Sequence, residues 1–111
     1  MTDSELILRA GLAAFSDADR VVAVNLDRFD PLNSRDDLVR LLLATGISFS
    51  RPSNIHIAAE AAGDTVKVTI ENGDELAAAA RAACELAASW VHDDDVEAWA
   101  IATRRSSRPR R

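Results

Sequence analysis

The strongest constraint on the fold is a helical stripe of small apolar side chains between residues 74 and 90. Asp74 follows an Asn72-Gly73 turn and stands where the N-cap of a helix is expected. Alanine dominates the positions that share one helical face, which are Leu76, Ala79, Ala80, Ala83, Leu86, Ala87 and Trp90. Because alanine has little volume, the backbone of this helix must approach its neighbours closely. The pattern therefore predicts a helix that is packed tightly into the fold.

Two more helices are indicated by capping residues that precede apolar side chains at helical spacing. The first covers residues 2–16, where Thr2 begins a capping box. The second covers residues 34–46, where Ser34 is the expected N-cap and Gly46 the expected end. Each segment is predicted to bury one face, because it carries apolar side chains three and four residues apart, which are Leu8, Leu12 and Phe15 in the first and Leu38, Leu41 and Leu42 in the second.

Four segments have the residue pattern of strands. Residues 20–26 are β-branched and apolar on both faces, as in an inner strand. Residues 54–61 and 65–71 alternate between apolar and polar side chains and are joined by a short turn, which predicts a hairpin. Residues 96–103 alternate in the same way and are expected to form the last strand. Residues 47–53 are expected to be mostly loop, because a proline interrupts them.

The order of these elements predicts an α+β fold of ferredoxin-like type. After an extra N-terminal helix, the chain has the split βαβ order βαββαβ, which gives a four-stranded antiparallel sheet. Two helices are expected to cover one face of the sheet, leaving alanines and valines of the other face for a partner surface. A chain of 111 residues is one domain by size. We expect a single domain over residues 1–103 and a disordered, Arg-rich tail over residues 104–111.

The charges divide the chain into an acidic body and a basic end. Five of the 13 basic residues lie in the last eight positions, namely Arg104, Arg105, Arg108, Arg110 and Arg111. The remaining body holds eight basic and all 18 acidic residues, so it repels polyanions. This balance argues against a folded surface that reads nucleic acid. Only the Arg tail is expected to make weak nucleic-acid contacts.

Several features indicate a cytoplasmic protein with few catalytic side chains. No stretch approaches the roughly 18 apolar residues of a membrane span, and Asp3 and Glu5 stand where a signal peptide would be basic. No membrane association is expected. Cys84 is the single cysteine and is expected to be a small buried apolar residue. The acidic run that follows His92 is expected to be the solvated end of the helix at residues 74–90.

Two segments of the chain resemble those of a known enzyme family. The run Asn25-Leu26-Asp27-Arg28-Phe29-Asp30-Pro31-Leu32-Asn33 is similar to the D-L-D-x-F-K-x-I-N segment of the GGDEF family, the diguanylate cyclases. The hairpin run Ala62-Gly63-Asp64-Thr65-Val66 falls where that family has its name-giving signature. The class III nucleotidyl cyclases have a similar core and hairpin. The resemblance implies a shortened palm-like domain.

The resemblance also implies a nucleotide site that has lost part of its charge. In a palm-type site, carboxylates hold two Mg²⁺ or Mn²⁺ ions that activate a hydroxyl and bind a triphosphate. Asp27 and Asp64 match acids of the family and are the expected metal ligands, and the catalytic residues, if the protein is an enzyme. Asn25, Phe29 and Asn33 are the expected nucleotide-binding residues. The family has an acid where this chain has Asn25, so the resemblance implies a degenerate site.

The sequence leads to a ranking of functions. The first is a small non-catalytic binding or regulatory protein, without a cofactor, that contacts a protein partner or its own copy as a homodimer and retains nucleotide binding at most. The alternative is a metal-dependent nucleotidyl cyclase or transferase that uses Asp27 and Asp64. The third is an inhibitor, or a nucleic-acid accessory protein that uses the Arg tail.

Overall fold

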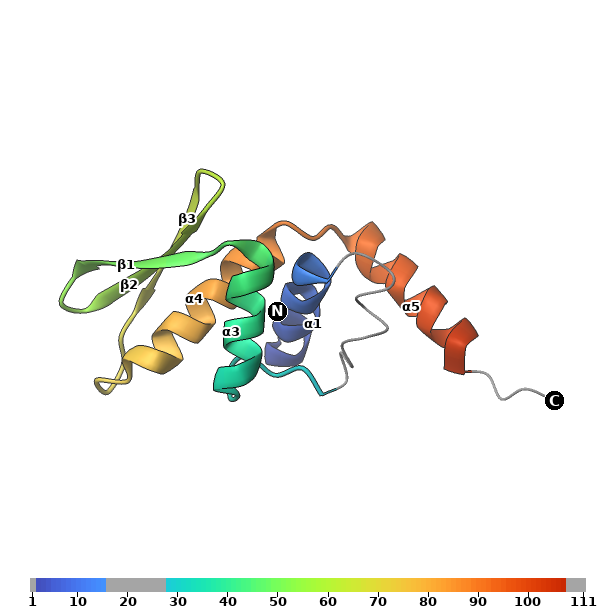
Figure 1. The fold of residues 1–111 in the computed structure, drawn as a ribbon, viewed down its shortest axis with the longest axis horizontal. Helices are drawn as coiled ribbons and strands as arrows, with labels where there is room; N and C mark the ends of the chain where they lie inside the picture. Colours follow the sequence, from blue (N-terminus) through green and yellow to red (C-terminus); the bar gives the residue numbers. More distant parts are fainter. Residues whose placement is uncertain (1, 16–27, 108–111) are drawn as a thin grey trace.

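The computed structural model describes residues 2–15 and 28–107, with residues 102–107 described by their backbone alone. These residues form four helices and one antiparallel sheet with strand order β1-β2-β3 (Figure 1). The elements in chain order are α1 (Asp3–Ala14), α3 (Arg35–Thr45), β1 (Ser48–Ser53), β2 (His56–Ala61), β3 (Asp64–Thr69), α4 (Glu75–Ser89) and α5 (Asp93–Ser107). In this part of the chain, no helix combines the length and the apolar character needed to cross a bilayer.

Side-chain caps begin three of the helices, as the sequence predicts. Thr2 Oγ1 caps α1, Ser34 Oγ caps α3 and Asp74 Oδ1 caps α4, each by accepting a backbone N–H three residues further on. Gly46 ends α3 with a φ of 73°, in the left-handed region that glycine adopts without steric cost. The predictions for residues 2–16, 34–46 and 74–90 are therefore confirmed to within about two residues.

The predicted hairpin is confirmed as β2 and β3. Ala61 pairs with Asp64 across a two-residue turn, in which Ala62 and Gly63 both have positive φ values of 53° and 85°. Two successive positive φ values give a turn whose twist matches that of the flanking strands. The register places Ala59 opposite Val66 on the face that packs against α4.

The prediction of a loop over residues 47–53 is wrong, because Ser48–Ser53 forms strand β1. This strand pairs with β2 only and lies at the edge of the sheet. Its register shifts between Ser50 and Ser53, which is the stretch that contains Pro52. A proline lacks the N–H that a central strand needs, but an edge strand with an irregular register accommodates it.

The prediction of a strand over residues 96–103 is also wrong, because these residues lie within α5. The partly buried residues Val96, Trp99 and Ala100 have the spacing of one helical face. The aspartates at 93–95, expected to end the preceding helix, instead fill the first turn of α5, where negative charge is favourable. Asp95 Oδ2 accepts the His92 backbone N–H at 3.0 Å, which fixes this start.

The four-stranded ferredoxin-like sheet is therefore corrected to a three-stranded antiparallel sheet within the described residues, although the α+β class stands. The strand predicted at residues 20–26 lies outside the described residues. The backbone of residues 104–107, assigned to a separate tail, continues α5. Residues 108–111 lie outside the described part of the chain.

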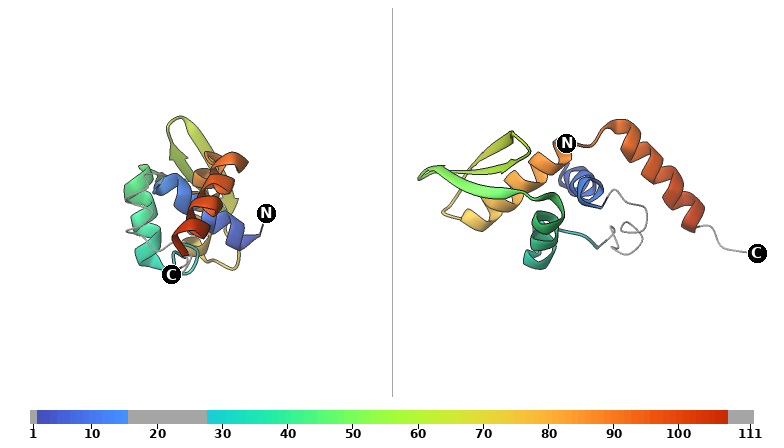
Figure 2. Two further views of the ribbon diagram at one scale, coloured as in Figure 1. Left: turned by 90° about the vertical axis from the view of Figure 1, so that its right-hand side faces the viewer. Right: turned by 45° about the horizontal axis from the view of Figure 1, so that its top comes forward.

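The core forms around α4, which lies between the sheet and α1 (Figures 1 and 2). One side of α4 packs on β2 and β3, and another packs on α1. Its small side chains are almost inaccessible to solvent, with Ala82, Ala83, Cys84 and Ala87 at 0% exposure. This arrangement confirms the close packing that the alanine stripe predicts. In contrast, α5 extends away from the sheet and contributes to a length of 58 Å (Figure 1).

Candidate functional site

Of the two predicted metal ligands, Asp64 lies in the described part of the chain. Its carboxylate is hydrogen-bonded to a tryptophan side chain. It is the first residue of β3, directly after Gly63 in the hairpin turn. Its Oδ2 accepts the indole N–H of Trp90 at 3.0 Å. Because Trp90 is the C-cap residue of α4, this bond connects the hairpin turn to the end of the central helix. The carboxylate therefore has a structural role in this fold.

Phe29, a predicted nucleotide-binding residue, lies in the core. Only 4% of the residue is exposed. Its ring meets that of Phe15 edge to face, with centroids 5.4 Å apart and an interplanar angle of 86°. The ring thus joins the segment before α3 to the end of α1, and a nucleotide does not reach it in this conformation.

Asn33, the second predicted nucleotide-binding residue in the described part, belongs to the turn that leads into α3. Its backbone N–H and its side-chain amide both donate to Asp30, to the carbonyl oxygen and to Oδ2 respectively. The Asp30 N–H in turn donates to Asp37 Oδ2 at 2.9 Å. These hydrogen bonds fix the start of α3, whereas Asp30 Oδ1 is buried and has no hydrogen-bond partner in the part of the chain that the structure describes. The Asn33 side chain itself is exposed.

The described residues of the predicted palm-type site do not converge. The turn between β2 and β3 lies at the top of the molecule in Figure 1, whereas the turn before α3 lies at the bottom. Asn33 and Asp64 are therefore not brought together. Asn25 and Asp27 lie outside the described residues, so the pairing of Asp27 with Asp64 stays a prediction. Among the described residues, no three His, Cys, Asp or Glu side chains form a group that could hold a metal ion.

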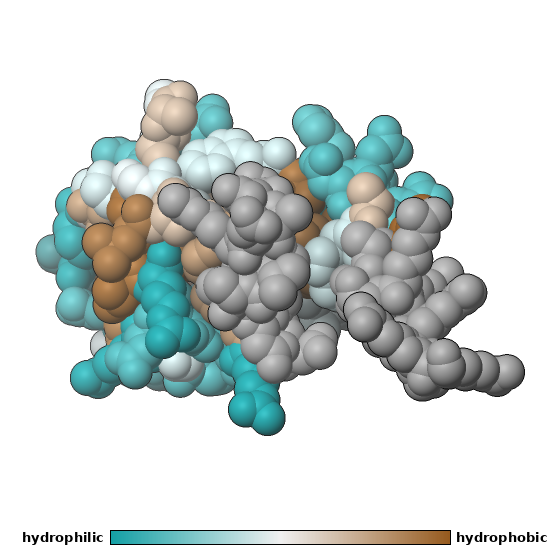
Figure 3. Space-filling model, turned by 45° about the vertical axis from the view of Figure 1, so that its right-hand side comes forward, coloured by the Kyte–Doolittle hydropathy of each residue, from teal (hydrophilic) through white to brown (hydrophobic). Residues whose placement is uncertain are grey.

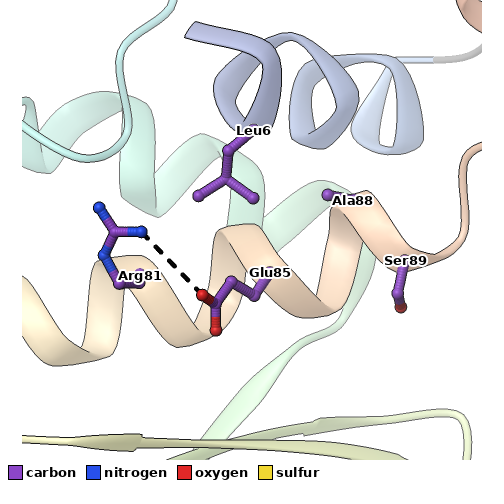
Figure 4. A pocket seen from close by; sticks show the side chains of 5 residues that line it. All are labelled: Leu6, Arg81, Glu85, Ala88 and Ser89. Atoms are coloured by element: carbon purple, nitrogen blue, oxygen red, sulfur yellow. Dashed lines mark ion pairs between the residues drawn. The ribbon is translucent and has the colours of Figure 1, made fainter. Parts of the chain in front are cut away.

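A pocket of about 270 Å³, which no sequence pattern predicts, lies between α1 and α4. Figure 4 shows Leu6 of α1 pointing toward α4, where Arg81 and Glu85 lie one turn apart. Arg81 donates to Asp3 at 2.9 Å and lies 4.0 Å from Glu85. The hydrogen bond to Asp3 raises the pKa of Arg81. Arg81 is thus paired with Asp3 of α1 and with Glu85 of its own helix, and the pair with Asp3 connects the two helices.

Arg9 attaches α5 to the rest of the protein. Its guanidinium donates to the backbone oxygen of Val91 at 3.2 Å and to the carboxylates of Asp93 and Glu5. The hydrogen bond with Asp93 is the main reason that the pKa of Arg9 is raised. The Arg9 side chain is 11% exposed, whereas that of Asp93 is 92% exposed. Arg9 therefore holds the start of α5 from the surface of α1.

Cys84 is buried, as the sequence predicts, and its thiol has low reactivity. Burial raises the pKa of its thiol to about 12, and the charge of Asp30 adds to this rise while that of Arg81 opposes it. The thiolate is the nucleophilic form of cysteine. At neutral pH this form is almost absent, so Cys84 does not supply a nucleophile.

Ser53 and His56 form a hydrogen-bonded pair that the sequence analysis did not identify. Ser53 Oγ lies 2.8 Å from His56 Nδ1, and it also accepts the backbone N–H of Ile55 at 3.3 Å. These bonds close the turn between β1 and β2. Both side chains hydrogen-bond within this turn and lie at its exposed end. The pair therefore stabilises the connection between β1 and β2 and does not form a substrate site.

The uncovered face of the sheet is polar, contrary to the expectation of alanines and valines there. The strand register assigns nine residues to this face, which are Ser48, Ser50, Ser53, His56, Ala58, Glu60, Thr65, Lys67 and Thr69. Only Ala58 among them is apolar. The alternate residues of β2 and β3 instead pack on α4, so the valines of the hairpin are used in the core. The open face of the sheet is therefore not an apolar docking surface.

Exposed apolar side chains are instead found on α3. Leu43 is 81% exposed and Val39 is 51% exposed, and the two lie one helical turn apart. The opposite side of α3 carries Leu38 and Leu41, which are buried. In the view of Figure 3, apolar surface on the left half of the molecule borders hydrophilic side chains. A helix with one face in the core thus presents a second apolar row to solvent.

Comparison with known proteins finds no family model, no curated protein and no solved structure that matches this chain. The resemblance to the GGDEF family thus stays a prediction based on the two motifs around Asp27 and Asp64.

Proposed function

We propose that this protein is a small non-catalytic binding module that acts through protein–protein contacts, including contacts with its own copy. The observation that carries the proposal is the exposed pair Val39 and Leu43 on a helix whose other face is already buried. Full burial of one leucine side chain is worth about 1.5–3 kcal/mol. A chain that leaves such a side chain in water gains this free energy when a partner covers it.

The arrangement of the polar groups supports the same proposal. The carboxylate of Asp64 bonds Trp90, the amide of Asn33 bonds Asp30, and Arg81 of the pocket bonds Asp3. Each of these groups has a partner within the protein that contributes to its fold. The apolar pair on α3 has no such partner among the described residues, which makes it the feature best suited to recognition.

The proposal is tested with the purified full chain and two matched variants. Leu43→Asp places a charge in the exposed pair, and Ile55→Asp does the same at another exposed apolar residue, which is 58% exposed in the turn before β2. Sedimentation equilibrium and affinity capture are expected to show self-association or a bound partner for the wild type and for Ile55→Asp. The association should be lost in Leu43→Asp. A strictly monomeric wild type that captures no partner would refute the proposal.

One assay separates this function from catalysis by a palm-type site. The protein is incubated with Mg²⁺ or Mn²⁺ and each nucleoside triphosphate, and the mixture is analysed by chromatography. We expect no product. A product that disappears in Asp64→Ala would overturn the proposal in favour of a nucleotidyl cyclase or transferase, and it would show that Asp64 does more than accept the Trp90 bond.

A further inference from the structure

We draw no further inference here: the strongest candidate, the exposed apolar surface patch of Val39 and Leu43 on α3, belongs to the proposed function already argued, and nothing in the part of the chain that the structure describes shows what covers it.

Discussion

Cys84 shows how one buried side chain couples folding to pH. Its thiol pKa rises from 9.0 to about 12 on folding, mainly because burial disfavours the thiolate. Below pH 9 the thiol is protonated in both the folded and the unfolded state, so its contribution to stability is complete. Above pH 9 the unfolded chain loses the proton while the folded chain keeps it. The free energy of unfolding therefore falls as pH rises from 9 toward 12.

We predict that this fall approaches about 1.4 kcal/mol per pH unit for the part that depends on Cys84. The measurement is urea unfolding of wild type and Cys84→Ala between pH 8 and pH 11. The variant is expected to be less stable at pH 8, because it leaves a small cavity, but its stability should depend less on pH. In addition, iodoacetamide should modify native Cys84 far more slowly than the unfolded chain at pH 8. Parallel pH curves for the two proteins would contradict this account.

At the level of elements, α5 depends on the contacts that hold its first turn. Arg9 bonds Val91 and Asp93, and the rest of α5 extends beyond the core (Figure 1). We predict that Arg9→Met speeds amide hydrogen exchange in α5 and leaves exchange in α4 nearly unchanged. Methionine keeps most of the apolar stem but loses every hydrogen bond. Asp93→Asn is the matched control and should have a smaller effect, since the bond from Arg9 to Val91 remains.

The sequence predicted elements well where a local signal was sufficient. Ser34 and Asp74 marked helix starts because an N-cap acts on its own backbone neighbourhood. Strand β1 was missed because its proline is tolerated only at the edge of a sheet, which is a property of the tertiary fold. For residues 96–103, alternation of tryptophan, isoleucine and alanine matched a strand, yet spacings of three and four fit a helix equally. The aspartates at 93–95 favour the helix, because negative charge in its first turn and the hydrogen bond from the His92 N–H to Asp95 stabilise its start.

The candidate site was less predictable than the fold, because its residues are defined by distant partners. Asp64 accepts a hydrogen bond from Trp90, which lies 26 positions further along the chain, and the ring of Phe29 packs edge to face on that of Phe15. Neither pair has a signature in the sequence. The sequence led to no prediction for Leu43, which is 81% exposed. A helical wheel drawn with Leu38 and Leu41 as the centre of the buried face would have placed Leu43 toward solvent.

For the whole molecule, the decisive feature is that the sheet and α1 share one central helix. Because α4 packs on both, loss of its packing exposes apolar surface of every layer at once. We therefore expect the body to unfold as one cooperative unit, with α4 and the strands it covers exchanging amide hydrogens most slowly. The small residues of α4 set the separation of the layers, so added volume there cannot be absorbed locally.

Substitution of Ala83 by leucine tests this view of the whole fold. Ala83 has 0% exposure, so the larger side chain must push apart elements that contact α4, and we predict a loss of about 1–3 kcal/mol in the free energy of unfolding. Ala44→Leu is the control, because Ala44 is exposed on α3 and should tolerate leucine within about 0.5 kcal/mol. Urea unfolding followed by circular dichroism and tryptophan fluorescence should give coincident, single transitions for both variants. Separate transitions for the sheet and the helices would contradict this view. They would show that the leucine at position 83 destabilises only one layer, so that α4 does not couple the unfolding of the sheet to that of the helices.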